Sequence, residues 1–461
     1  MDQRAFLEHF ERGVERMHAG FARWEPVEPD PSTRADPDQV ERVLTELTER
    51  LKVDYPYFHP RYAGQMLKPP HPVAMLAYAL TMFVNPNNHA LDGGRATSEM
   101  EKEIIPQLAA MFGYPEETHL GHLTASGTIA NLEALWIARC LHPDKAIAVS
   151  DQAHYTHARA GDLLRTEIKT IKSDADGKID LDHLAELLAS GEIGTVVATA
   201  GTTGLGAVDP IHEIRRMTAE AGVRLHVDAA YGGFFALLAR ATNPPIAPEP
   251  WLAIAESDSV VVDPHKHGLQ PYGCGAVLFR DAAVGRFYQH DSPYTYFTSD
   301  ELHLGEISLE CSRAGAAAAA FWATLKCFPL EPERGFGQIL GRTQQAAQKW
   351  AALLKCHPRF RLTVEPELDI VSFFALPAGD SEPAASAISA LTRKVFHAAE
   401  RDPEEPVYLA TLKVDREKLE GRYPEIRWDQ PVVEVLRSVL MKPEHADWVP
   451  RIQAAIERQL N

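Results

Sequence analysis

The sequence predicts an α/β protein with a mostly parallel sheet, because short apolar runs alternate with helical stretches through its middle. The runs are rich in Val, Ile and Ala, and Gly, Pro, Asp or Ser residues bound them. They lie at 146–149, 195–199, 224–227, 259–262 and 275–279. Helical patterns at 181–189 and 211–221 separate some of them. Short buried strands joined by helices are typical of a parallel sheet covered on both faces.

The pattern of residues 1–65 predicts a separate helical segment. A proline-rich stretch at 26–31 interrupts it. Apolar residues recur there at helical spacing, at Phe6, Phe10, Val14 and Met17. Charged residues surround them, so the pattern indicates an amphipathic helix and not a signal peptide. The segment is too short to fold alone, and we expect it to pack on another surface, such as a partner subunit.

The rest of the chain predicts two domains. Residues 66–325 hold the alternating pattern and form the expected large domain. Residues 326–461 form a smaller α+β domain, in which the run 370–374 predicts a strand.

Composition excludes several classes of protein. The chain has 461 residues, 45% of them hydrophobic, which is enough for two domain cores. A formal net charge of −18 argues against a nucleic-acid partner. No apolar run reaches the length of a membrane span. The five cysteines are scattered and never spaced CxxC, which predicts a reduced cytoplasmic protein with neither disulfides nor a metal site.

A lysine follows the predicted strand at 259–262, in the motif Asp263-Pro264-His265-Lys266-His267. Burying a lysine is costly unless charged partners or covalent chemistry compensate. An amine in such a pocket becomes nucleophilic enough to bond a carbonyl carbon when its pKa is lowered. The motif alone leaves open the alternative of an ordinary surface lysine.

An aspartate, Asp228, ends the predicted strand at 224–227, and small residues follow it up to Gly233. Ligands of open α/β sheets bind at the carboxyl ends of strands. A carboxylate there can keep a pyridine nitrogen protonated, and small neighbours such as Ala230 let a flat ring lie close. A metal-binding or helix-capping aspartate is the alternative.

Two further motifs have the features of a ligand site. The small, hydroxylated stretch 124–131 opens a helix at Gly127 and Thr128, and a helix start offers free N–H groups and a positive dipole end to a phosphate. His154 lies just past the predicted strand at 146–149, where its ring can stack on a planar ligand. A simple helix cap and a structural histidine are the respective alternatives.

These four motifs, in this order, resemble the group II pyridoxal-phosphate-dependent amino-acid decarboxylases, over nearly the whole chain. Asp263-Pro264-His265-Lys266 and the segment from His226 to Gly233 are specific in combination. The resemblance implies the type I fold of pyridoxal-phosphate-dependent transferases, with a mostly parallel, seven-stranded-type sheet in the large domain. It also implies pyridoxal 5'-phosphate as the cofactor and a homodimer with active sites at the subunit interface.

The resemblance also implies roles for single residues. Lys266 would hold the cofactor covalently, Asp228 would pair with its pyridine nitrogen, and His154 and Ala230 would cover the two faces of its ring. The phosphate would bind Gly127, Thr128 and His265. Either Thr202 or Thr203 would lie beside the remaining ring substituents, and the sequence does not choose between them.

Substrate contacts are implied as well. Tyr294, with Tyr296 as reserve, matches the tyrosine of a mobile loop that protonates the carbon left by carbon dioxide; an ordinary surface tyrosine is the alternative. Arg437 is an arginine available for a carboxylate, or else part of a structural ion pair. Tyr57 and His89 belong to segments that line the substrate pocket in relatives.

The expected reaction is decarboxylation of an L-amino acid to its amine. The stretches 127–136, 263–272 and 310–322 look closest to bacterial tyrosine decarboxylases, so an aromatic substrate, tyrosine first, is favoured. Aspartate or glutamate decarboxylation, an aldehyde-forming decarboxylation–deamination and a retro-aldol reaction are the alternatives. A non-catalytic cofactor-binding protein is disfavoured because both Lys266 and Asp228 are present. A dinucleotide-binding dehydrogenase is disfavoured because no GxGxxG follows the first strand.

Overall fold

The computed structural model describes residues 1–289, 308–379 and 382–460. Its large sheet consists of β1 (Leu120–Thr124), β2 (Ala146–Ser150), β3 (Ile168–Ile171), β4 (Ile193–Thr199), β5 (Arg224–Asp228), β6 (Ser259–Val262) and β7 (Gly275–Phe279). The strand order is β1-β7-β6-β5-β4-β2-β3. All neighbours from β3 to β6 pair in parallel, and β7 is antiparallel to both β1 and β6. The predicted α/β fold with a mostly parallel sheet is confirmed.

The five predicted strands form because each is short, apolar and buried on both faces, as β4 is along its whole length. The helices α7 (Leu181–Ala189) and α8 (Ile211–Ala221) match their predicted ranges. The sequence pattern did not reveal β1 or β3. The first contains a glycine and a histidine, and the second is a half-exposed edge strand with Lys169 and Thr170 at its centre.

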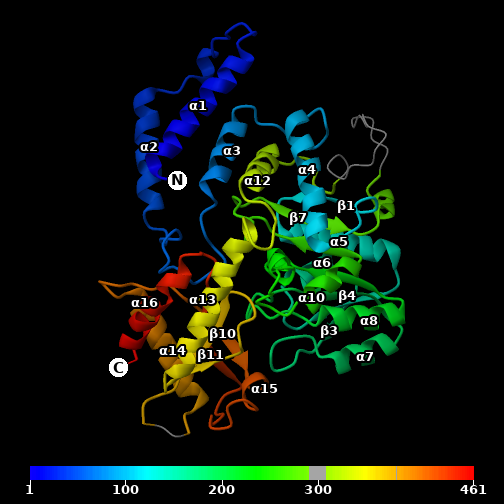
Figure 1. Ribbon diagram of the computed structural model, residues 1–461, viewed down its shortest axis with the longest axis vertical. Coiled ribbons are helices and arrows are strands. Elements are labelled where there is room, and N and C mark those ends of the chain that lie inside the picture. The colour runs from blue at the N-terminus through cyan, green and yellow to red at the C-terminus, as the bar shows by residue number, and fades with distance from the viewer. Residues whose placement is uncertain (290–307, 380–381, 461) are drawn as a thin grey trace.

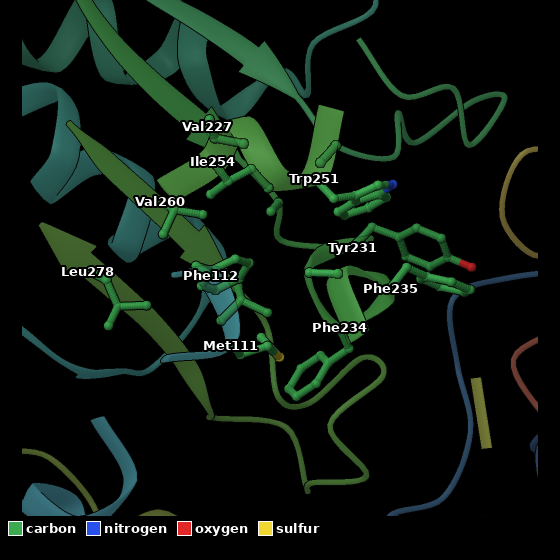
Figure 2. Close-up of a cluster of buried hydrophobic side chains, with 14 of the residues drawn as sticks. Met111, Phe112, Val227, Tyr231, Phe234, Phe235, Trp251, Ile254, Val260 and Leu278 are labelled. Carbon is green, nitrogen blue, oxygen red and sulfur yellow. The ribbon is translucent and has the colours of Figure 1, made fainter. Parts of the chain in front are cut away.

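Helices cover both faces of the large sheet, which follows from the alternation along β6. Val260 and Val262 join the main core, whereas Val261 faces the other way into a cluster with α5 (Gly127–Leu141). Figure 2 shows the main core, where Met111 and Phe112 of α4 (Arg95–Phe112) approach side chains of the sheet. The remaining helices around this sheet are α3 (Pro72–Met82), α6 (Thr156–Leu164), α9 (Ala236–Ala239), α10 (Glu249–Leu252) and α12 (Gly315–Cys327).

A second sheet has the antiparallel order β10-β11-β9-β8. Its strands and helices are β8 (Phe360–Leu362), β9 (Ile370–Ala375), β10 (Ala410–Asp415), β11 (Val432–Val439), α13 (Phe336–Cys356), α14 (Ala385–Glu400), α15 (Arg416–Leu419) and α16 (His445–Arg458). Trp350, Phe373 and Val449 lie in its core. The small α+β unit is therefore present. The boundaries at 65 and 325 stay predictions, and α13 gives Phe336 and Leu340 to the core of the large sheet.

The N-terminal helices α1 (Gln3–Phe21) and α2 (Pro37–Leu51) bury none of their residues. In Figure 1 they form a blue arm that stands apart from both sheets. The chain then returns to the body of the molecule, where the Ala63 N–H donates to the carbonyl of Tyr408 and the Ala63 carbonyl accepts from Val439 N–H, each over 2.8 Å. Among the described residues, no helix combines the length and apolarity needed to cross a membrane.

Candidate active site

The four predicted motifs meet at one edge of the large sheet, where β2, β4, β5 and β6 have their carboxyl ends. They surround a cavity of about 350 Å³, a volume in the usual range of small-molecule sites. Its lining residues are Ser126, Gly127, Thr128, Asn131, His154, Tyr155, Thr156, Thr199, Gly201, Thr203, Asp228, Ala230, Tyr231, Asp263, His265, Lys266 and Tyr272.

Lys266 lies in the tight turn that follows β6, where its N–H donates to the Asp263 carbonyl over 2.9 Å. The same turn brings the Lys266 Nζ to 3.0 Å from Asp263 Oδ2. The Asp263 side chain is 4% exposed, so this ion pair lies at the buried floor of the cavity. The His265 ring lies against Tyr272, with centroids 4.9 Å apart, and burial lowers the pKa of His265.

Asp228 is the last residue of β5, as predicted, and its carboxylate is buried. One oxygen accepts from His157 Nε2 over 2.9 Å, and the other accepts from the Ala230 N–H over 3.1 Å. Burial opposes ionisation of this carboxyl, but the hydrogen bond and charge of His157 and the charge of Lys266 outweigh it and lower the pKa of Asp228. The site therefore holds a carboxylate, which is the form that a pyridinium needs as its partner.

The N-terminus of α5 opens on the cavity. Ser126 caps the helix, since its hydroxyl accepts from the Ile129 N–H, and Asn131 donates to the Gly127 carbonyl over 2.9 Å. A Cβ on Gly127 would lie 2.6 Å from an Asp263 carboxylate oxygen, closer than real Cβ atoms approach. Only glycine therefore leaves room at this helix start. Thr128 presents its hydroxyl 3.3 Å from that of Thr156.

His154 lies between β2 and α6, and its Nδ1 is 2.7 Å from the Thr156 hydroxyl. Its ring lies 4.2 Å from that of Tyr155, centroid to centroid, and Tyr155 is 60% exposed at the mouth of the cavity. Burial lowers the pKa of His154. A neutral, flat imidazole thus lines the cavity from the side of α6.

Thr202 and Thr203, between which the sequence did not choose, occupy different positions relative to the cavity. Thr203 lines the cavity, whereas the Thr202 hydroxyl is buried and accepts from the Ala207 N–H over 3.1 Å within its own turn. Arg437 does not line the cavity. It donates instead to the backbone carbonyls of Thr203 and Gly204, over 2.6 and 2.9 Å. The contact of Arg437 with a substrate carboxylate stays a prediction. To make that contact, Arg437 would have to give up its hydrogen bonds to Thr203 and Gly204.

Two other predicted residues, Tyr57 and His89, are not among the residues that line this cavity. Tyr57 contacts Tyr55 and Tyr62 near the small sheet. The His89 ring lies against the backbone of Gly93. Tyr294 and its reserve Tyr296 lie outside the described residues. Their roles stay predictions.

Several residues of the site were not assigned by sequence reasoning. Asp263 was only part of a motif, and Tyr155, Tyr231 and Tyr272 were not connected with the cavity. His157 was missed entirely. Its sequence context gave little signal, because His154 lies just before α6 and His157 is the second residue of that helix.

The cavity fits a flat, phosphorylated ring such as pyridoxal phosphate. Within the described part of the chain, three buried polar atoms of its lining residues have no hydrogen-bond partner: Thr199 Oγ1, Asp263 Oδ1 and His265 Nδ1. Buried polar atoms without partners are rare unless a ligand or water satisfies them. The open helix start, the buried carboxylate and a lysine amine in one cavity supply contacts for a phosphate, a ring nitrogen and an aldehyde.

Comparison with known proteins agrees with this geometry. The pyridoxal-dependent decarboxylase conserved domain matches residues 26–376. A probable L-tyrosine/L-aspartate decarboxylase of Methanothermobacter thermautotrophicus is 32% identical over 69% of this chain and 84% of its own length. The L-tyrosine decarboxylase of Enterococcus faecium is 30% identical over 70% of this chain and 69% of its own. The L-aspartate decarboxylase of Thermococcus kodakarensis is 29% identical over 72% of this chain and 84% of its own.

Solved structures share the fold. Oryza sativa TDC with PLP and tryptamine superimposes with a TM-score of 0.78 at 17% identity, covering 100% of this chain and 99% of that one. Mouse CSAD superimposes with a TM-score of 0.76 at 19% identity, covering 99% and 98%. The family match spans most of the chain, including the cavity with Lys266, Asp228 and His154. The chain therefore belongs to the pyridoxal-dependent decarboxylases and is a pyridoxal-phosphate-dependent amino-acid decarboxylase.

Proposed function

We propose that this enzyme converts an aromatic L-amino acid, tyrosine first, to its amine and carbon dioxide. The charge of the cavity lining carries this proposal. Lys266 is the one lysine or arginine among the described lining residues, and it faces two carboxylates, Asp228 and Asp263. A substrate with a second carboxylate would meet like charge there, to which a bound phosphate would add. The rings of Tyr155 and Tyr272 at the same cavity suit an apolar, ring-bearing side chain.

The names of the relatives support an aromatic substrate, and they also leave aspartate as a possible substrate. Two of the relatives described above have tyrosine in their names, and two have aspartate. Decarboxylation of aspartate or glutamate is therefore the outcome that a substrate panel must be able to detect.

We assign the cofactor contacts from the cavity. Gly127, Thr128 and His265 hold the phosphate, Asp228 holds the pyridine nitrogen, His154 and Ala230 cover the ring, and Thr203 lies beside it. The Lys266 amine must be neutral to attack the aldehyde carbon. The Asp263 carboxylate, 3.0 Å away, is within reach of the proton that Lys266 has to lose.

Bound pyridoxal phosphate supplies an electron-accepting ring that stabilises negative charge on the substrate α-carbon. The protein decides which bond breaks by orienting the substrate, and a carboxylate held perpendicular to the ring is the group that leaves. We propose that the Tyr294 hydroxyl then delivers a proton to the α-carbon, with Tyr296 as the reserve candidate; both lie outside the described residues.

We further propose a homodimer. Val40, Val43, Leu44, Leu47 and Leu51 form one stripe along α2, and each is between 42% and 56% exposed. A contiguous apolar stripe of this kind is typical of a protein–protein interface. In a dimer, the segments with Tyr57 and His89, which lie outside their own cavity, would approach that of the partner.

The five unpaired cysteines support a reducing, cytoplasmic location.

An absorption spectrum tests the cofactor site. The purified protein should be yellow with pyridoxal phosphate, borohydride should fix the colour covalently, and Lys266→Ala should abolish it. Lys102→Ala, a partly exposed lysine paired with Glu99, is the matched control and should stay yellow. A Lys266→Ala protein that retains covalently fixable colour would refute the assignment of Lys266.

A panel of the twenty amino acids, scored for carbon dioxide and amine, tests the substrate. We expect tyrosine to give the highest kcat/KM, with other aromatic amino acids next. A preference for aspartate or glutamate would overturn the proposal while leaving the decarboxylase assignment intact.

A further inference from the structure

One buried histidine, His157, touches the proposed cofactor site without lining it. It is the second residue of α6, and its side chain is 1% exposed. Its Nε2 lies 2.9 Å from Asp228 Oδ2, and Asp228 lines the cavity whereas His157 does not. Any action of His157 on a ligand must therefore pass through Asp228.

The contacts of His157 show which of its ring nitrogens donates a hydrogen bond. Its Nδ1 is buried and has no hydrogen-bond partner among the described residues. A carboxylate can only accept a hydrogen bond, so the proton must sit on Nε2 whether the ring is neutral or charged. In both forms the ring donates to Asp228, and it is the one side-chain donor to this carboxylate in the described part of the chain.

We propose that His157 is a positioning residue, which fixes the Asp228 carboxylate and thereby sets its interaction with the pyridine nitrogen of the cofactor. The Ala230 N–H fixes the other carboxylate oxygen, so the two donors together leave the carboxylate one orientation. A carboxylate buried to this degree, without a donor on Oδ2, would lose much of its preference for the ionised form. This inference rests on the proposed role of Asp228.

Three substitutions separate the hydrogen bond from the volume of the ring. His157→Leu fills similar space but removes the donor. His157→Gln can place an amide N–H close to the position of Nε2, and His157→Asn is too short to do so. We expect Leu and Asn to weaken pyridoxal-phosphate binding by about tenfold to a hundredfold, the factor for one hydrogen bond to a charged group. We expect Gln to restore most of it.

The readout is the dissociation constant of pyridoxal phosphate and the absorption spectrum of the loaded protein. Loss of the donor should also shift the absorption bands of the bound cofactor, because the partner of the pyridine nitrogen influences the electron distribution of the ring. It should also lower kcat at saturating cofactor while the KM for the amino acid stays within about twofold. The control is His445→Leu, since His445 is as buried but bonds only to backbone atoms. It should lower stability and leave the spectrum unchanged.

The outcomes are distinguishable. If Asp228→Ala keeps the wild-type affinity and spectrum, the proposed cofactor site itself is wrong. If Asp228→Ala changes both and His157→Leu changes neither, only the role of His157 is refuted. If His157→Leu does not fold, the comparison of Gln with Asn decides, and equal spectra for these two variants would overturn the proposal.

Discussion

Arg437 donates from Nη2 to the backbone carbonyl of Thr203 over 2.6 Å, so a strand of the small sheet holds a loop of the cofactor cavity. The same guanidinium donates from Nε to Gly204 and from Nη1 to Gly64. One buried side chain thus joins the N-terminal segment, the large sheet and the small sheet.

Arg437→Met should therefore act on stability. It leaves three backbone carbonyls without their donor, and we expect a loss of roughly 2–4 kcal/mol in the free energy of unfolding, together with weaker cofactor binding. Denaturant unfolding measures the free energy of unfolding. The control Arg393→Met removes an exposed arginine that pairs with Glu434 of β11 and should cost under about 1 kcal/mol. Unchanged stability with a higher KM would instead support the predicted contact with a substrate carboxylate.

Gly127→Ala should lower the affinity for pyridoxal phosphate by at least about tenfold. The new Cβ would lie 2.6 Å from Asp263, and relieving this contact must shift either the helix start or the partner of Lys266. Titration of the apoprotein followed by absorbance measures the affinity. Gly341→Ala is the control, because its Cβ meets only one atom, at 4.0 Å, inside α13; it should stabilise the protein by up to about 1 kcal/mol. Equal affinities would show that the helix start is not a cofactor contact.

Stability should rise between about pH 7 and pH 10 because of Lys442. Burial, and then the nearby charge of Lys68, lower the pKa of Lys442 from 10.5 to about 7. Between those values the unfolded chain binds more protons than the folded one, so the free energy of unfolding increases with pH, by at most about 1.4 kcal/mol per unit. Denaturant unfolding across this range should show the rise, and Lys442→Met should reduce its slope; the remainder comes from Lys68, whose pKa burial lowers to about 8. Lys355→Met, at an exposed salt bridge, should leave the slope as it is.

Charges on the apolar stripe of α2 should dissociate the proposed dimer. Val43→Glu with Leu47→Glu places two carboxylates in the stripe, and sedimentation should then report a monomer with reduced activity. Arg42→Gln with Thr45→Glu changes the net charge equally on the other side of the helix and should leave the dimer intact. A monomeric wild-type protein, or a dimer that survives the paired glutamates, would contradict the assignment of this face.

Tyr294→Phe should reduce amine formation by at least about a hundredfold, the lower range for loss of a general acid, and shift the product toward aldehyde. Chromatography of amine and aldehyde from the same reaction measures both. Tyr296→Phe is the matched control and should behave like the parent. If Tyr296→Phe loses amine formation and Tyr294→Phe retains it, Tyr296 is the proton donor.

The large sheet could be predicted because its central strands are short, apolar runs with sharp ends, as at 259–262. The position of Asp228 and Lys266 at such ends was enough to expect them together, since parallel strands finish at one edge. The strand β10 was not evident, because an edge strand of a small antiparallel sheet carries Lys413 and Asp415 and lacks an apolar run.

Side-chain direction accounts for what the sequence did not reveal at the site. The contact of His157 with Asp228 depends on how α6 crosses β5, over a separation of 71 positions. The three bonds of Arg437 depend on the packing of one sheet against the other. Neither relationship leaves a periodic signal, because each is made by one side chain at one angle.

The hydrogen bond from Arg437 to the Gly64 carbonyl joins positions 373 residues apart, and Ala63 bridges Tyr408 and Val439 beside it. On the ribosome, the segment around Gly64 emerges before these partners, which are synthesised roughly 20 to 75 seconds later, at about 5–20 residues per second. The segment around Gly64 must therefore wait without these partners until β11 has been synthesised. Chaperone demand during synthesis should accordingly fall on the segment around Gly64 and ease once β11 has appeared.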